Sequence, residues 1–187
     1  MSGEDLLRSV VAALDRSGIP FMVTGSVAAA WHGAGRATMD IDLVIDPAAD
    51  QLAALVAALA EPGLYVSADA AREALERRSM FNVVDPTTGW KADLIVRKDR
   101  PFSRTEFARR APVEFVGTRV WVATVEDTIL AKLEWARLGG SARQIEDVAA
   151  LLRIWAGRLD DAYVAHWTAE LGVTAQRQAA QRAVEPL

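Results

Sequence analysis

The 187-residue chain contains no cysteine, so disulfide bonds, thiolate metal sites and a thiol nucleophile are excluded. It also lacks an uncharged apolar run of about 18 residues, so we expect no transmembrane helix. Residues 1–16 carry Glu4, Asp5, Arg8 and Asp15 among apolar residues at helical spacing, which is typical of an amphipathic helix and not of a signal peptide. We therefore expect a cytoplasmic protein that does not contact a membrane.

A strong positive charge is also missing. The net charge is −4, which argues against a protein that binds nucleic acid constitutively. The basic residues are unevenly distributed, since none occurs between Arg36 and Arg72, whereas the segment from Arg97 to Arg110 contains six. This contrast fits a basic rim beside an acidic site, and it equally fits ordinary solvated surface.

Apolar periodicity predicts an α/β (α+β) fold. Strands are expected over residues 21–24, 40–45, 64–66, 80–84, 90–97, 113–116 and 119–122. Helices are expected over 1–16, 26–32, 49–59, 67–77, 103–110, 124–138, 141–155, 160–171 and 174–184. Strands dominate the middle and helices the last third, so we predict a catalytic core at 1–123 and a helical C-terminal subdomain at 124–187 packed on it.

Residues 23–45 contain two features that suggest a site for chemistry. Gly25-Ser26 lies between an apolar run and a helix-forming run, so backbone N–H groups and the Ser26 hydroxyl can bind a phosphate there. Asp40 and Asp42 begin a strand, and side-chain alternation puts both carboxylates on one face. Such a pair is costly without a cation between its members. A metal next to a phosphate suggests nucleotide chemistry.

Simpler roles remain open for these residues. Ser26 is also a good helix N-cap without any ligand, and Asp40 and Asp42 are also suited to a turn before the strand. Arg36 and Thr38 lie just upstream of the two acids. Arg36 can neutralise a phosphate or hold an acid in place, and it is equally suited to an exposed loop.

Asp93 is the third candidate carboxylate. It is the only acid within the predicted strand 90–97, and an acid in the middle of an apolar run needs a partner. One possible partner is a metal ion shared with Asp40 and Asp42. The other is a salt bridge to Lys91 or Arg97 on the same surface.

The order Gly-Ser, about a dozen residues, then Arg36-x-Thr38-x-Asp40-Ile-Asp42-Leu-Val-Ile resembles the signature of the nucleotidyltransferase superfamily with the polymerase-beta-like fold. The likeness is strongest to small bacterial members, including those of toxin–antitoxin and abortive-infection systems. It implies a mixed-sheet core and three carboxylates, Asp40, Asp42 and Asp93, that bind Mg²⁺ or Mn²⁺. It also implies that Lys132, on the helix 124–138, reaches the triphosphate, in addition to the nucleotide-binding residues Gly25, Ser26, Arg36 and Thr38. The alternative for Lys132 is a surface lysine.

We therefore expect a metal-dependent nucleotidyltransferase that moves a nucleoside monophosphate from a nucleoside triphosphate to an acceptor hydroxyl. The acceptor is RNA, a protein or a small molecule such as an aminoglycoside. A second hypothesis is a catalytically weak or inactive interaction module that binds the cognate partner of a toxin–antitoxin pair. A third is an α/β protein in which the Asp-x-Asp sequence is incidental.

Overall fold

The computed structural model describes residues 2–35, 37–60 and 63–184. Its internal contacts divide the chain into two compact units, Met1–Val27 with Ala37–Ala123 and Ala28–Arg36 with Thr124–Leu187. The segment 28–36 thus groups with the C-terminal helices, whereas the sequence-based boundary between residues 123 and 124 kept it in the first part.

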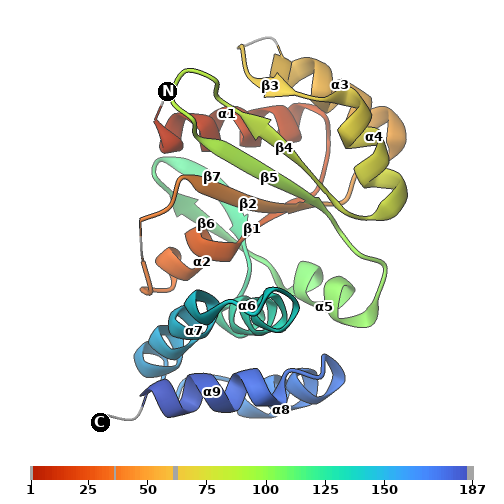
Figure 1. Cartoon of the computed structure of the whole chain (residues 1–187). Coiled ribbons are helices and arrows are strands. Elements are labelled where there is room, and N and C mark those ends of the chain that lie inside the picture. Colours follow the sequence, from red (N-terminus) through yellow and green to blue (C-terminus); the bar gives the residue numbers. More distant parts are fainter. Residues whose placement is uncertain (1, 36, 61–62, 185–187) are drawn as a thin grey trace. The chain divides into compact units, whose positions relative to one another are not determined.

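The first unit is built on a mixed sheet (Figure 1). Within the described residues the sheet has seven strands in the order β3-β4-β5-β2-β1-β7-β6. The neighbours β2 and β5 are parallel, as are β1 and β7, and the other neighbours are antiparallel. The α/β fold class is therefore confirmed. The strands are β1 Phe21–Thr24, β2 Asp40–Ile45, β3 Tyr65–Val66, β4 Met80–Val84, β5 Lys91–Val96, β6 Ala111–Phe115 and β7 Thr118–Val122.

Strand alternation separates an apolar face of the sheet from a polar one. In β2, Ile41, Leu43 and Ile45 are at most 3% exposed, while the residues between them are half-buried. In β5, Ala92, Leu94 and Val96 are fully buried and pair in register with those three residues. The remaining residues of β2 and β5 lie on the opposite face, which carries the polar side chains.

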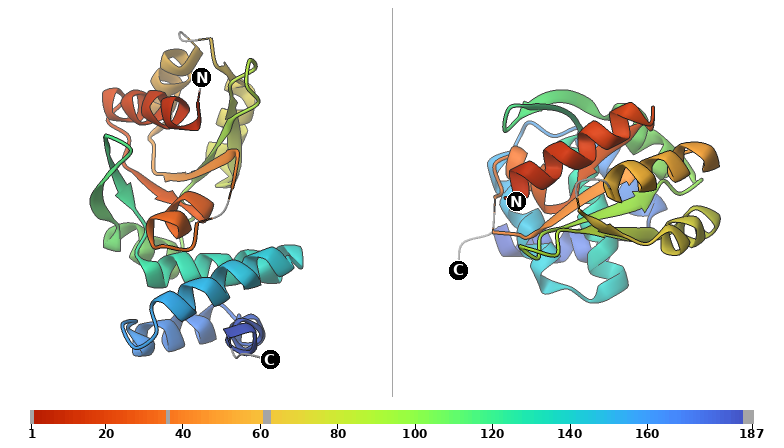
Figure 2. Two further views of the ribbon diagram at one scale, coloured as in Figure 1. Left: turned by 90° about the vertical axis from the view of Figure 1, so that its left-hand side faces the viewer. Right: turned by 90° about the horizontal axis from the view of Figure 1, so that it is seen from above.

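The helices of the first unit begin where the sequence provides caps. In α1, the Ser2 hydroxyl accepts from the Asp5 backbone N–H, and the Asp5 carboxylate accepts from the Ser2 N–H, which forms a capping box. The predicted amphipathic helix is confirmed, because Leu6, Val10 and Leu14 are all buried. Figure 2 shows α1 and α3 side by side. The helices are α1 Gly3–Arg16, α2 Gly25–Trp31, α3 Ala49–Ala60, α4 Ala68–Arg77 and α5 Pro101–Arg109, with α2 continuing into the second unit.

Two local predictions differ from the structure. The helix expected at 103–110 begins at Pro101, because proline has no backbone N–H and suits the first position of a helix. The hairpin turn between β6 and β7 consists of Val116 and Gly117, not of Gly117 and Thr118. Both turn residues have positive φ, 46° and 71°, as a two-residue turn that matches strand twist requires.

The second unit contains four described C-terminal helices, α6 Val125–Gly139, α7 Ala142–Ile154, α8 Asp161–Glu170 and α9 Thr174–Val184. Thr124 caps α6 by accepting from the Asp127 N–H at 3.2 Å. Apolar residues of α6, α7 and α9, among them Ile129, Leu151 and Ala180, form its core. No helix in the described ranges combines the length and the apolar character needed to cross a membrane.

Candidate active site

Strand register brings the three predicted carboxylates onto one face of the sheet. Asp42 of β2 pairs with Asp93 of β5, and Asp40 pairs with Lys91. Residues paired in register on neighbouring strands point to the same side of a sheet. Asp40, Asp42 and Asp93 therefore share the face opposite the apolar core. Asp93 is 7% exposed, so its carboxylate is largely withdrawn from water.

The Gly-Ser turn lies against one of these carboxylates. Thr24, the last residue of β1, pairs with Asp42, so the chain leaves the sheet for α2 beside the Asp42 side chain. Gly25 has φ +62°, and a Cβ built on it would lie 2.7 Å from Asp42 Cγ and closer still to the carboxylate oxygen Oδ2. Only glycine fits this approach. The next residue, Ser26, is buried.

A lysine and an asparagine bind the carboxylates. Lys91 Nζ donates to Asp93 Oδ2 at 3.2 Å and lies 3.6 Å from Asp40 Oδ1. Asn82 of β4, the register partner of Asp93, donates its Nδ2 to Asp93 Oδ1 at 2.5 Å. Burial alone would lower the pKa of Lys91, but the hydrogen bond and charge of Asp93, together with Asp40, raise this pKa above its usual value. The ammonium group is therefore charged at neutral pH.

The salt bridge between Lys91 and Asp93, one of the two partners that the sequence left open, is thus present. Sequence reasoning did not find Asn82. The strands expected at 80–84 and 90–97 would oppose Val84 to Trp90, whereas β4 and β5 oppose Val84 to Lys91 and therefore Asn82 to Asp93.

The other predicted site residues lie in different settings. The Thr38 hydroxyl accepts from the Asp40 N–H at 3.1 Å and donates to the Asp40 carbonyl at 3.3 Å, so it fixes the start of β2. Arg36 lies outside the described residues.

Lys132 of α6 is 2% exposed, which excludes a surface lysine. Its Nζ donates to Asp147 at 2.7 Å and to Gln144 at 3.1 Å, both on α7.

Asp40, Asp42 and Asp93 form what we call the acid face of the sheet. Their carboxylate oxygens suit a hard divalent cation, because these are the ligands that Mg²⁺ prefers. The ammonium group that already bridges Asp40 and Asp93 shows that positive charge is accommodated there. As the side chains stand in residues 2–35, 37–60 and 63–184, no three His, Cys, Asp or Glu residues enclose a metal position. The donor chemistry thus fits a metal, but the described side chains do not enclose one as they stand, and Lys91 lies between Asp40 and Asp93.

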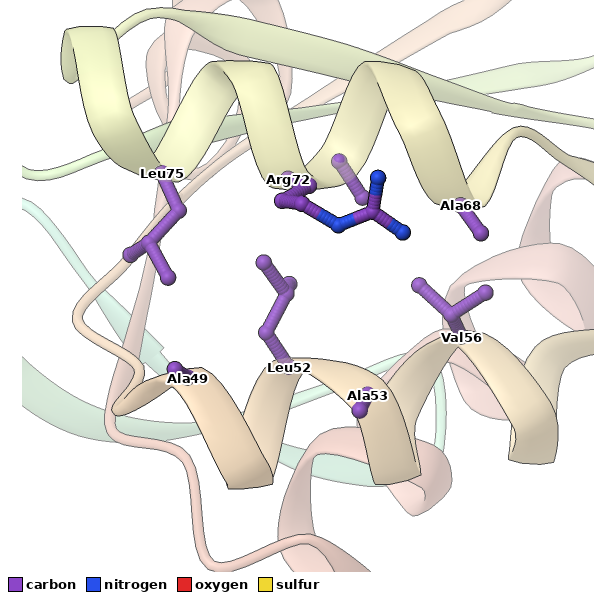
Figure 3. Close-up of a pocket in the computed structure, with 8 residues that line it drawn as sticks. Ala49, Leu52, Ala53, Val56, Ala68, Arg72 and Leu75 are labelled. Atoms are coloured by element: carbon purple, nitrogen blue, oxygen red, sulfur yellow. The ribbon is translucent and has the colours of Figure 1, made fainter.

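A second hollow in the first unit is apolar. A groove of about 300 Å³ runs between α3 and α4 (Figure 3). Among the described residues that line it, Arg72 alone is charged, and it forms an ion pair with Asp69 at 2.9 Å. None of these described lining residues carries a carboxylate. The groove is lined by Ala49, Leu52, Ala53, Val56, Ala68, Ala71, Arg72 and Leu75.

Comparison with solved structures identifies the fold. The crystal structure of ANT(2'')-Ia in complex with adenylyl-2''-tobramycin superimposes with a TM-score of 0.57 at 18% identity, over 90% of this chain and 96% of that one. The solution structure of the same antibiotic-resistance factor gives 0.54 at 18% identity, over 96% and 95%. The chain has the nucleotidyltransferase fold. An antigenic nucleotidyltransferase-like protein from Paracoccidioides brasiliensis shares this fold, with a TM-score of 0.53 at 17% identity over 94% and 91%.

The likeness extends along nearly the whole chain, so the nucleotidyltransferase fold includes the C-terminal helices as well as the sheet. No protein-family model and no curated protein matches the sequence.

Proposed function

We propose that the protein is a metal-dependent nucleotidyltransferase, which moves a nucleoside monophosphate from a nucleoside triphosphate to an acceptor hydroxyl. The observation that carries this proposal is the pairing of Asp42 with Asp93 on one sheet face, beside the Gly25 turn. Carboxylates attract divalent cations, and the backbone N–H groups of a glycine turn attract phosphates. The Asp42–Asp93 pair is therefore suited to bind a metal, and the Gly25 turn beside it is suited to bind a phosphate. The fold supports the same reaction class.

In the proposed reaction the acceptor oxygen bonds to the α-phosphorus, the bond from that phosphorus to the bridging oxygen breaks, and pyrophosphate leaves. Asp40, Asp42 and Asp93 would hold Mg²⁺ or Mn²⁺, which when bound supplies positive charge to the phosphate oxygens. Gly25 and Ser26 bind the β- and γ-phosphates through backbone N–H groups and the hydroxyl.

Three further nucleotide-binding residues stay predictions. Thr38 supports the site through the Asp40 backbone that it binds. Arg36 is assigned to phosphate by its place in the signature alone. Lys132 would have to exchange its buried partner Asp147 for a phosphate in order to contact the triphosphate.

The acceptor is a hydroxyl of RNA, of a protein or of a small molecule. The ANT(2'')-Ia complex contains an adenylylated aminoglycoside, so aminoglycosides are the first small molecules to test. The cytoplasm, where nucleoside triphosphates and Mg²⁺ are abundant, suits this chemistry.

The test follows label from the triphosphate. The protein is incubated with Mg²⁺, each of the four common triphosphates and RNA, protein or aminoglycoside acceptors. We expect label on the α-phosphate to enter the acceptor and label on the γ-phosphate to leave as pyrophosphate. Asp42→Asn and Asp93→Asn should each lower the rate about 100-fold or more, because each removes a charge that the transition state needs.

Asp50→Asn is the matched control, because it removes an exposed acid from α3 in the same unit and should retain the wild-type rate. Absence of transfer with every triphosphate and acceptor would contradict the proposal. Full activity in Asp42→Asn would contradict the assigned site.

One observation favours the alternative of a weak or inactive interaction module of a toxin–antitoxin pair. The Lys91 ammonium group occupies the space between Asp40 and Asp93, where an active enzyme needs a divalent cation. This alternative predicts slow or absent turnover and a specific protein partner that co-purifies with the chain. Rapid triphosphate-dependent transfer without such a partner would exclude it.

A further inference from the structure

Lys91 places a positive charge among the carboxylates of the candidate site. It is the first residue of β5 and the register partner of Asp40, and it precedes Asp93 by two positions, so all three side chains share one face. Its Nζ lies 3.2 Å from Asp93 Oδ2 and 3.6 Å from Asp40 Oδ1. One ammonium group therefore bridges two of the three carboxylates that we propose to hold a metal.

The Asp93 end of this bridge differs from an ion pair on open surface, whereas the Asp40 side chain is 51% exposed. The Asp93 side chain is 10% exposed, against 37% for Lys91. Asp93 also accepts from Asn82 at 2.5 Å, so each of its carboxylate oxygens has a donor. A divalent cation that binds Asp93 must either move the ammonium group aside or tolerate its charge a few ångströms away, and both weaken metal binding.

The partly exposed Lys91 side chain is able to make way for a metal. A lysine has a flexible four-carbon stem and a compact charge, so it can turn to solvent without movement of the strand. The two carboxylates, by contrast, are fixed by the paired strands β2 and β5. A metal held by Asp40 and Asp93 would therefore compete with the ammonium group for these carboxylates.

We propose that Lys91 is a built-in cation of this site. Its ammonium group neutralises Asp40 and Asp93 when no divalent cation is bound, and it competes with a divalent cation for these carboxylates. This inference rests on the proposed function and deepens it, because Lys91 then sets the affinity with which the site takes up its metal.

The test is a Mn²⁺ titration of the full chain without nucleotide, in which free Mn²⁺ is followed by electron paramagnetic resonance. Lys91→Met removes the charge and keeps an unbranched side chain one atom shorter, so it should bind Mn²⁺ about tenfold more tightly than the wild type, or better. Lys91→Arg keeps the charge and should stay within about twofold of the wild type, since the guanidinium still competes. Lys91→Gln repeats the test should Lys91→Met fail to fold, as judged by circular dichroism.

Lys98→Met is the matched control, because Lys98 is exposed and lies beyond the other end of β5. It should bind Mn²⁺ as the wild type does. The inference is overturned if the neutral Lys91 variants bind Mn²⁺ no more tightly than the wild type, or if Lys98→Met gains as much affinity as they do.

The two proposals fail separately. A gain of Mn²⁺ affinity in Lys91→Met, combined with no nucleotidyl transfer by any protein tested, would support the role of Lys91 and contradict the enzyme. Transfer that depends on Asp42, combined with unchanged Mn²⁺ affinity in Lys91→Met, would support the enzyme and overturn the role of Lys91.

Discussion

At the scale of single residues, Gly25 carries the tightest steric demand in the site. Any side chain at this position meets the Asp42 carboxylate, and φ of +62° adds backbone strain for any residue other than glycine. The contact is a consequence of strand register, since Thr24 and Asp42 are paired across β1 and β2. The Gly25 turn and the Asp42 carboxylate are therefore in direct contact, which is the arrangement that a site for a metal-bound phosphate would require.

Gly25→Ala is predicted to destabilise the protein and to weaken nucleotide binding. The new methyl group must displace Asp42 or the turn, and we expect a loss of about 2–4 kcal/mol in the free energy of unfolding, measured with urea. Gly89→Ala is the control, because Gly89 also has positive φ, +78°, but a methyl group added there would meet no atom within 4 Å, so this variant should lose only about 1 kcal/mol. Equal losses in the two variants would show that the contact with Asp42 is unimportant.

At the scale of secondary-structure elements, the hairpin of β4 and β5 positions Lys91, Asn82 and Asp93. Its loop is held by Asp85, whose carboxylate accepts from the Thr87 N–H at 2.9 Å and from the hydroxyls of Thr87 and Thr88, each at 2.6 Å. These hydrogen bonds, those from the two hydroxyls foremost, hold the pKa of Asp85 well below its usual value. The ionised carboxylate therefore stabilises the hairpin and, through it, the site.

This hairpin contribution should depend on pH. A carboxyl whose pKa is lowered by folding stabilises the folded state above its unfolded pKa of about 3.9, and the contribution is lost as the pH falls. Asp85→Asn should therefore be less stable than the wild type at pH 7, and the difference should narrow below about pH 4, as measured by urea unfolding across this range. Thr87→Val should reproduce part of the loss at pH 7. A difference that is constant from pH 7 to pH 3 would refute this role of Asp85.

The elements themselves were largely predictable, because their signals are local. Period-two alternation predicted the strand at 40–45 and the shared face of Asp40 and Asp42, and the turn at 85–89 predicted the hairpin of β4 with β5, though not its register. The positive φ of Val116 was not predictable, since a β-branched residue rarely adopts it.

At the scale of the whole molecule, the pairing that creates the site is non-local. Asp42 meets Asp93 through parallel strands that are separated, in the described residues, by two helices and two strands, and a shift of one residue in this register would turn one carboxylate to the other face. The sequence named candidate site residues but did not predict this register. The resemblance to the nucleotidyltransferase superfamily implied that Asp93 acts together with Asp40 and Asp42, although the local pattern did not specify how their strands pair.

Long-range pairing also explains what sequence reasoning missed in the second unit. In the structure, Lys132 of α6 donates to Asp147 of α7, in an environment where both side chains are less than 10% exposed. A buried lysine needs an acid, but the choice among several acids depends on how helices pack.

The central claim is that the acid face beside the Gly25 turn binds a divalent cation together with a triphosphate. The most direct measurement is anomalous X-ray diffraction from crystals of the protein with Mn²⁺ and a non-hydrolysable triphosphate. We predict a Mn²⁺ peak about 2.2 Å from a carboxylate oxygen of Asp42, with triphosphate density at the N–H groups of Gly25 and Ser26. A peak at other residues only, or triphosphate bound away from this turn, would contradict the account.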